Sequence, residues 1–291
     1  MKPVHGGLAN NLARRISESV FRRYKRARRR LVRLDERTIL EALQSFGAFD
    51  RDLLFVHSSL SACGFIAGGP ATVVSALRSW ISDRGALALP THTWSYPDES
   101  GVAPVYDYAL TPSVVGEITN YYWKQPGSVR SLHPSHSLAC NGPEAERLCE
   151  GHEFCETPCG AGTPYQRIAE GDSSVLMFGA TMNAYTLFHT AEDAAGVPYL
   201  YMPQQVTLRS KGKDGTVRSI RMWRHDMGVT RRFAETADWL EERRLLIRRR
   251  LGLGELLFIP RARALHETVV KTLRHDPLFL VHQKARFEAA D

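Results

Sequence analysis

The chain has 291 residues, of which 43% are hydrophobic and 24% are charged. This length and composition are typical of a globular protein with a substantial core, and they exclude a disordered or fibrous chain. No run of eighteen apolar residues is present, and arginines occupy the N-terminal region where a signal peptide would carry its hydrophobic segment. Five irregularly spaced cysteines favour reduced thiols over a disulfide framework. We therefore expect a cytoplasmic protein.

The net charge of +7 is distributed unevenly along the chain. Residues 1–33 carry a net charge of +10 and residues 221–291 a net charge of +5, so residues 34–220 carry −8. An acidic central region suits a cationic substrate better than a nucleic acid.

Residues 1–36 are expected to form a basic amphipathic N-terminal arm. Apolar residues recur at helical spacing from Leu8 to Val32, while Lys and Arg fill the other face. Such a helix could lie on an anionic membrane or on RNA, but packing on its own domain or on the partner of a homodimer is at least as consistent with the pattern.

A strand–loop–helix–strand unit follows the arm. The pattern predicts a buried strand over residues 53–56, a helix from Pro70 to about Gly85, and a returning strand over residues 86–91. This order favours a parallel strand pair with a right-handed crossover. The Ser- and Gly-rich loop before Pro70 offers backbone N–H groups at a helix start, which suits a pyrophosphate, although such loops often only turn the chain.

The later elements also follow from local patterns. Proline at the first helical position predicts helices over 112–123 and 143–149 and a short one from Pro164. The second half of 130–140 is predicted to be a strand, and residues 204–209 and 216–222 a hairpin around the turn 213–215. From about residue 225 we expect a mostly helical, Arg-rich part, with one helix carrying Trp239, Leu240, Leu245, Leu246 and Ile247 and another carrying Ala264, Leu265, Val269, Val270 and Leu273.

The order of these elements predicts the fold class. Residues 37–291 are expected to form a single α/β domain with three layers, α/β/α, around a mixed and partly parallel central sheet.

Four potential metal ligands lie close together in the sequence: Cys149, His152, Cys155 and Cys159. Soft ligands of this kind can form a tetrahedral zinc site. Structural zinc sites usually combine two close pairs that are well separated in sequence, whereas this string is one short loop. Ordinary buried thiols are therefore the preferred interpretation, and no metal is expected.

His189 and Glu192 form the most informative candidate pair. They follow a predicted buried strand over 175–180, and on a helix their spacing of three residues lets the side chains touch. A carboxylate beside an imidazole fixes the tautomer and raises the basicity of the ring, as a general base requires. A surface ion pair on the helix is the alternative.

Five motifs together resemble the aminoglycoside 3-N-acetyltransferase family, in the same order over roughly residues 37–200. They are Val56-His57-Ser58-Ser59-Leu60-Ser61, Leu89-Pro90-Thr91-His92, Arg130-Ser131-x-His133-Pro134-x-x-Ser137, Gly160-x-Gly162-Thr163-Pro164 and His189-Thr190-Ala191-Glu192. Each motif alone would be a weak signal, but their joint occurrence is specific.

The resemblance implies an acyltransferase that uses acetyl-CoA as donor and a small cationic amino sugar as acceptor, with antibiotic resistance as one biological outcome. His189 and Glu192 match the catalytic pair. The residues that match the coenzyme A side are Ser59, Leu60, Ser61, Thr91, Arg130, Ser131, His133, Pro134 and Ser137. We further expect three acidic residues to contact the cationic acceptor, namely Asp98, Glu99 and Asp193.

Three other hypotheses remain open at the level of sequence. The enzyme could acylate an amino sugar of antibiotic or surface-glycan biosynthesis. A non-catalytic protein could bind RNA or membrane through residues 1–33. A zinc hydrolase could instead use four histidines, His57, His92, His133 and His189.

Overall fold

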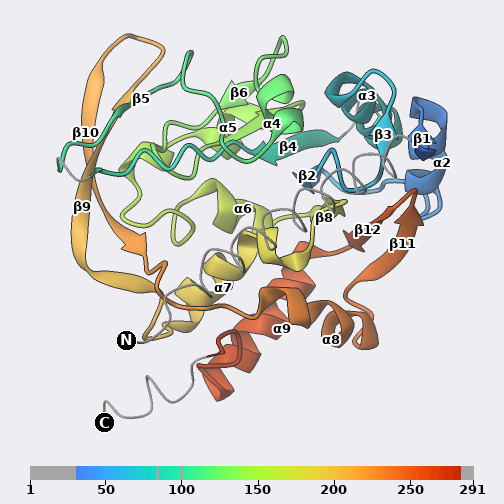
Figure 1. The fold of residues 1–291 in the computed structure, drawn as a ribbon. Coiled ribbons are helices and arrows are strands. Elements are labelled where there is room, and N and C mark those ends of the chain that lie inside the picture. The colour runs from blue at the N-terminus through green and yellow to red at the C-terminus, as the bar shows by residue number, and fades with distance from the viewer. Residues whose placement is uncertain (1–30, 83–84, 99–100, 283–291) are drawn as a thin grey trace, which may run out of the picture.

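The computed structural model describes residues 31–82, 85–98 and 101–282 (Figure 1). Its strands are β1 (Arg33–Leu34), β2 (Leu53–Ser58), β3 (Phe65–Ile66), β4 (Ala86–Pro90), β5 (Val105–Asp107), β6 (Val129–Arg130), β7 (Leu138–Asn141), β8 (Ser173–Phe178), β9 (Tyr201–Lys211), β10 (Val217–His225), β11 (Ile247–Leu251) and β12 (Gly254–Ile259). Its α-helices are α2 (Glu36–Gln44), α3 (Pro70–Ile81), α4 (Glu117–Tyr122), α5 (Ala145–Cys149), α6 (Pro164–Glu170), α7 (Leu187–Ala195), α8 (Thr236–Glu242) and α9 (Ala262–His275). Short 3-10 helices are η1 (His152–Phe154), η2 (Met182–Ala184) and η3 (Phe233–Glu235).

A seven-stranded mixed sheet forms the centre of the molecule, in the order β11-β12-β8-β2-β4-β7-β6. The three middle strands, β8, β2 and β4, run parallel, and the outer strands pair antiparallel. The predicted parallel pairing of the strands on either side of α3 is confirmed. The carboxyl ends of β2, β4 and β8 therefore meet at one edge of the sheet, where open α/β folds usually bind ligands.

Helices cover both faces of this sheet, which confirms the three-layer prediction. On β2, Leu54 and Val56 pack with α2, α3 and α4, whereas Leu53 and Phe55 pack with α5, α6, α7 and α9. β8 alternates in the same way between the two clusters. Because side chains alternate across a strand, a continuous apolar run is what two buried faces require.

The predicted hairpin is confirmed and is longer than expected. β9 and β10 pair antiparallel and, with β5, form a second sheet in the order β10-β9-β5. The hairpin curves along one side of the molecule in Figure 1. Its far end brings His225 back toward the central sheet, beside α7.

The prediction of a mostly helical C-terminal part is wrong in one segment. α8 ends at Glu242, so Leu245 and Leu246 do not continue that helix, and Ile247 begins β11. Arg244 adopts a left-handed backbone with φ of 58°, which interrupts a helix. β12 then pairs with β8, so the β11–β12 hairpin extends the central sheet. The predicted helix around Val269 is confirmed as α9.

The predicted helix over 112–123 begins later than expected, at Glu117 in α4. Gly116 precedes it with φ of 125°, which is incompatible with helix. The side chain of Asn120 binds both the N–H and the carbonyl of Ser113, so the segment after Pro112 folds back on the helix as a loop. Proline at the first position is borne out for α6, which begins at Pro164.

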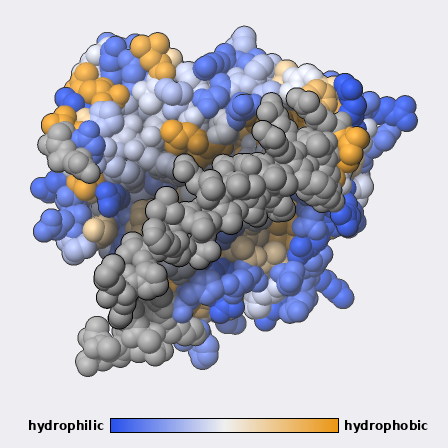
Figure 2. Space-filling view, viewed as in Figure 1, coloured by the Kyte–Doolittle hydropathy of each residue, from blue (hydrophilic) through white to orange (hydrophobic). Residues whose placement is uncertain are grey.

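Most of the predicted N-terminal arm lies outside the described residues, as does Glu99. The end of the arm is described, and there Arg33–Leu34 forms β1, which pairs parallel with β3. None of the helices within the described residues combines the length and the apolar character that a membrane span requires. Figure 2 shows that the face seen in Figure 1 is largely hydrophilic, with scattered apolar residues.

Candidate functional site

The candidate site lies at the carboxyl edge of the three parallel strands. His57 and Ser58 end β2, and His92 follows β4. The chain leaves β8 through Gly179 and enters α7, which carries His189. Because the three strands are parallel and adjacent, residues that are far apart in sequence reach the same edge.

His189 is held by a buried carboxylate. Its Nδ1 lies 2.6 Å from Oε2 of Glu192, and the Glu192 side chain is completely buried. The other oxygen of Glu192 accepts from Nε of Arg231 at 3.3 Å. The bond at Nδ1 leaves Nε2 as the nitrogen available to a ligand, so the carboxylate selects the tautomer. The surface ion pair considered from sequence is excluded by this burial.

The electrostatic environment keeps His189 neutral. Burial, and then the nearby Arg231 cation, hold the pKa of His189 well below its usual value of 6.5. Burial also raises the pKa of Glu192, while Arg231 opposes that shift. A neutral imidazole at neutral pH can accept a proton.

His189 lines a pocket of about 510 Å³. Half of the residues in the pocket wall are aromatic or histidine, and the others carry hydroxyl, amide or non-aromatic apolar side chains. Its lining residues are His57, Ser58, Pro90, His92, Trp94, Tyr96, Val115, Thr119, His136, Asn183, Ala184, Tyr185, Thr186, His189, His225 and Met227. Two large apolar side chains of this wall, Trp94 and Met227, are exposed and mark the pocket mouth. An aromatic wall can bind a sugar face or a cation.

Arg130 and its neighbours form a buried network behind this pocket. Arg130 is 3% exposed and donates to Oγ1 and the carbonyl of Thr91 and to the carbonyl of Thr111. Ser137 bonds the same threonine through its hydroxyl. The guanidinium also lies over the rings of Tyr106 and Trp123. In this conformation Arg130 fixes the loop after β4, and its predicted contact with coenzyme A stays a prediction.

The other residues of that motif are buried as well. Ser131 lies 2.9 Å from Nδ1 of His152, and His133 accepts from two backbone N–H groups at its own Nδ1 while stacking on His152. The carbonyl of Pro134 accepts from Thr93 and Ser95. These residues shape the loop that presents His136 to the pocket. The direct contact of Ser131, His133 and Pro134 with the donor stays a prediction.

The loop after β2 is more open. Ser59 and Leu60 are partly buried and Ser61 is exposed. The loop lies close to the end of β8, because Gly179 has no side chain and a Cβ there would lie 3.0 Å from the Ser59 carbonyl. Beside the loop, the hydroxyl of Ser58 is buried without a hydrogen-bond partner among the described residues, and Ser58 lines the pocket. This part of the site can accept a polar group of a ligand.

Of the acidic residues expected at the acceptor site, the two described ones, Asp98 and Asp193, are not in this pocket. Asp98 is exposed and does not line the pocket. Asp193 accepts from the hydroxyl of Tyr201 and lines a different cavity, of about 400 Å³. The Tyr201 hydroxyl holds the Asp193 carboxylate at β9, outside the His189 pocket. Glu192 lies behind His189, so the carboxylate nearest the pocket is already used.

The Cys/His string separates into individual interactions. His152 uses both ring nitrogens, toward Ser131 and toward the carbonyl of Pro158. The thiols of Cys149 and Cys155 donate to backbone carbonyls, and all five cysteines are free. The short loop therefore does not gather its four side chains around one point.

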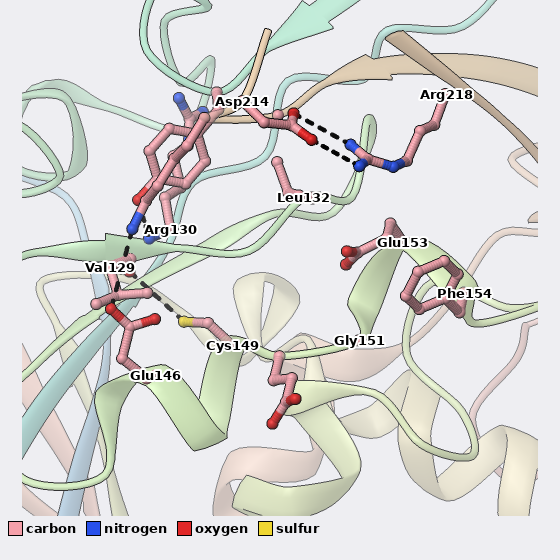
Figure 3. Close-up of a pocket in the computed structure, with 14 residues that line it drawn as sticks. Val129, Arg130, Leu132, Glu146, Cys149, Gly151, Glu153, Phe154, Asp214 and Arg218 are labelled. Carbon is pink, nitrogen blue, oxygen red and sulfur yellow. Dashed lines mark hydrogen bonds and ion pairs between the residues drawn. The ribbon is translucent and has the colours of Figure 1, made fainter. Parts of the chain in front are cut away.

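A second cavity, of about 530 Å³, lies on the outer side of the buried Arg130 network (Figure 3). Figure 3 shows Asp214 and Arg218 of the hairpin pointing toward each other and Cys149 pointing toward Val129. Lys213 also faces Glu146 at 3.9 Å. The charges on this wall largely neutralise one another, and the cavity contains no arrangement like that of His189 and Glu192.

The pattern of the sequence did not reveal three important site residues: His136, His225 and Arg231. The His225 ring lies 4.3 Å from the His189 ring and 5.3 Å from the His136 ring, centroid to centroid. Each comes from a separate segment. His136 occupies an unspecified position of the Arg130–Ser137 motif, and His225 and Arg231 belong to no motif. Alternation along β10 buries Ile220 and Met222, and His225 is buried only because the register shifts between Trp223 and His225, so alternation alone would not have revealed it.

Comparison with known proteins places this geometry in a family. The family model described as aminoglycoside 3-N-acetyltransferase matches residues 55–274. Aminoglycoside N(3)-acetyltransferase IV of Salmonella sp is 30% identical over 244 residues, which cover 84% of this chain and 89% of the relative. Aminoglycoside N(3)-acetyltransferase III of Salmonella sp is 34% identical over 178 residues, covering 56% of this chain and 62% of the relative. That match spans less than two thirds of the relative.

Solved structures agree with this assignment. Aminoglycoside acetyltransferase AAC(3)-IVa, as apoenzyme, superimposes with a TM-score of 0.73 at 26% identity, covering 88% of this chain and 94% of that chain. A mutant of AAC(3)-IVa in complex with a gentamicin superimposes with a TM-score of 0.74 at 28% identity, covering 87% of this chain and 93% of that chain. AAC-IIIb in a binary complex with CoASH shares the fold, with a TM-score of 0.72 at 21% identity, covering 84% and 97%.

Proposed function

The chain belongs to the aminoglycoside 3-N-acetyltransferase family, and on that premise we propose that it transfers an acetyl group from acetyl-CoA to an amino group of an aminoglycoside or a related amino sugar. The observation that carries the proposal is the bond between His189 and the buried Glu192 at the wall of a pocket of about 510 Å³. The sequence resemblance and the family match support the same reaction class.

His189 serves as the general base in this proposal. Nε2 of the neutral ring takes a proton from the acceptor ammonium, and the amine nitrogen attacks the thioester carbonyl carbon. The C–S bond breaks, and the leaving sulfur takes up a proton. Glu192 steadies the imidazolium that forms during attack, because its carboxylate accepts from Nδ1 throughout. Both substrates are held together, so the transfer needs no acyl-enzyme.

The donor would enter beside the loop after β2. Acetyl-CoA supplies the acetyl thioester when it is bound, and AAC-IIIb, which shares the fold, has been solved with CoASH. The buried Ser58 hydroxyl, which lacks a partner among the described residues, supports the fit of a carbonyl or amide group here. Ser59, Leu60 and Ser61 are the accessible residues of the predicted donor side.

The acceptor would occupy the part of the pocket near Trp94 and Tyr96. The gentamicin bound to the AAC(3)-IVa mutant supports an aminoglycoside as the acceptor class. In the described part of the wall, aromatic faces rather than carboxylates are offered to a cation, and cation–π contacts stabilise by about 0.5–2 kcal/mol each. This wall also supports the alternative acceptor, an amino sugar of lower charge.

The function is tested by following thiol release from acetyl-CoA with a panel of aminoglycosides and amino-sugar nucleotides. We expect thiol release that depends on the acceptor. His189→Ala should lower kcat by about two to four orders of magnitude, because proton transfer is lost, while the affinity for coenzyme A changes little. His275→Ala, at an exposed position on α9, is the matched control and should behave as the unmodified protein.

Two results would contradict the proposal. Absence of thiol release with every acceptor would remove the activity itself. Near-unchanged turnover of His189→Ala would leave the reaction intact but exclude His189 as its base. A preference for anionic sugar nucleotides that is insensitive to salt would favour the biosynthetic alternative over aminoglycosides.

A further inference from the structure

Three side chains from three separate segments meet beside the His189 pocket. His136 comes from the loop before β7, Cys159 from the loop after η1, and His225 from the end of β10. One potential ligand atom of each lies within 4.8 Å of those of the other two. We propose that His136, Cys159 and His225 form a zinc-binding site, which is distinct from the Cys/His string of the sequence and shares with it only Cys159.

The spacing of the three atoms suits a metal ion. Zinc binds imidazole nitrogen at about 2.0–2.1 Å and thiolate sulfur at about 2.3 Å, so tetrahedral ligand atoms lie roughly 3.3–3.8 Å apart. The three atoms within 4.8 Å therefore need an inward movement of about 1 Å at most to reach that separation. Rotations about the side-chain bonds can provide it without moving the strands.

The ligand atoms are buried and lack competing bonds. His136 is 7% exposed, Cys159 is fully buried and His225 is 2% exposed. Nε2 of His225 has no hydrogen-bond partner among the described residues. A buried polar group without a partner costs about 1–3 kcal/mol, so its presence requires an explanation. Coordination to a metal provides one, and the thiol of Cys159, which has no hydrogen bond in the described part of the chain, provides a second ligand.

The surroundings orient the two rings. The Ser135 hydroxyl lies 2.9 Å from Nδ1 of His136, which leaves Nε2 of that ring for the metal. Tyr201 stacks on His225 with 5.6 Å between ring centroids. Outer partners of this kind fix the orientation of metal-binding histidines.

The chemistry of the ligands selects the metal class. Two imidazoles and one thiolate favour zinc over magnesium or calcium, which prefer oxygen ligands. Three protein ligands leave a fourth coordination position. Because His136 and His225 both line the pocket, that position is close to the pocket rather than to the core. The site would connect the end of β10 with two loops around His189.

Metal binding to the purified full-length protein tests the proposal. The protein is stripped with chelator and titrated with zinc and with cobalt, which reports thiolate coordination by a charge-transfer band in the near ultraviolet. We expect one equivalent of either metal per chain, no binding of magnesium, and a rise in Tm with zinc. Less than half an equivalent of zinc, or cobalt without the thiolate band, would overturn the proposal.

Matched variants assign the ligands. Cys159→Ser should lose the cobalt thiolate band and at least tenfold in zinc affinity, whereas Cys155→Ser, a buried thiol four residues away, should retain both. If Cys159→Ser does not fold, His225→Gln keeps the thiolate and should still weaken zinc binding by at least tenfold. Equal losses in Cys155→Ser and Cys159→Ser, or unchanged affinity in His225→Gln, would refute the assignment.

Discussion

Glu192→Gln, which removes the negative charge of Glu192, should affect stability and activity through two different interactions of this carboxylate. Glu192 is completely buried between His189 and Arg231, which is itself only 11% exposed. Glu192→Gln preserves size and a hydrogen-bonding oxygen but leaves the Arg231 cation without its anion. Breaking a buried ion pair in this way costs about 3–5 kcal/mol of unfolding free energy.

The effect on catalysis has a different source. A hydrogen bond to a charged group contributes about 1.5–3 kcal/mol, and losing that contribution in the transition state lowers kcat by about 10- to 150-fold. The bond affected is the one of 2.6 Å between Glu192 and Nδ1 of His189. Glu192→Gln should therefore be less severe than His189→Ala, which removes the base itself.

The double variant Glu192→Gln/Arg231→Met distinguishes the two effects. Neutralising Arg231 removes the unpaired buried cation, so about 1–4 kcal/mol of the lost stability should return. Activity should stay low, because His189 still lacks its carboxylate. Urea unfolding and steady-state thiol release, measured on the same preparations, provide the two readouts.

An exposed pair serves as the control. Glu241 bonds Arg248 at a position where the glutamate side chain is 44% exposed. Glu241→Gln should cost at most about 1 kcal/mol and leave kcat unchanged. The reasoning would be refuted if the double variant regained activity together with stability, because the carboxylate would then act only by balancing Arg231.

Three further predictions concern stability. Burial lowers the pKa of His57 and of His152 from 6.5 to about 3, so below pH 6.5 the unfolded chain binds protons that the folded chain does not. Each histidine should therefore remove up to about 2 kcal/mol of unfolding free energy by about pH 5. His57→Gln should reduce this loss of stability between about pH 7.5 and 5, measured by urea unfolding, and an unchanged loss would count against the prediction. Arg130→Met should lower the unfolding free energy by about 2–4 kcal/mol, because it removes three buried hydrogen bonds. The KM for acetyl-CoA should change little. A raised KM with unchanged stability would instead indicate that Arg130 binds the donor directly. Gly179→Ala should lower the unfolding free energy by about 1–3 kcal/mol more than Gly196→Ala in thermal unfolding. Both glycines have a left-handed φ, but only at Gly179 would a Cβ lie 2.9 Å from the Cys63 sulfur. Equal losses of stability would show that the loop after β2 moves easily to make room for the Cβ.

Local patterns in the sequence were sufficient for several elements. The apolar run over 53–56, the helix from Pro70 and the strand from residue 86 are set by burial and helix-start signals that need no distant partner. The same holds for the hairpin around 213–215 and for the three-residue spacing that joins His189 to Glu192. In each case neighbouring residues alone define the geometry.

Other features were decided only by tertiary structure. Residues 247–259 carry arginines and leucines that suit a helix or a strand, and they became β11 and β12 because β8 offered an unpaired edge. Arg130 matches a residue of the coenzyme A side in the sequence, and only the folded chain shows that its guanidinium is enclosed by partners 19 to 39 residues away. Its role depends on burial, which a motif does not specify.

The cluster of His136, Cys159 and His225 illustrates the same limit at the site. These residues are 23 and 66 positions apart along the chain and share no repeat or spacing. The spacing of the Cys/His string favoured ordinary buried thiols over a local zinc loop, and the folded chain directs His152 toward Ser131 and Cys159 toward two histidines from elsewhere. The sequence determined which chemical groups were available. The tertiary structure determined which of them meet, because the end of β10 and the two loops come together only when the sheet and its helices pack.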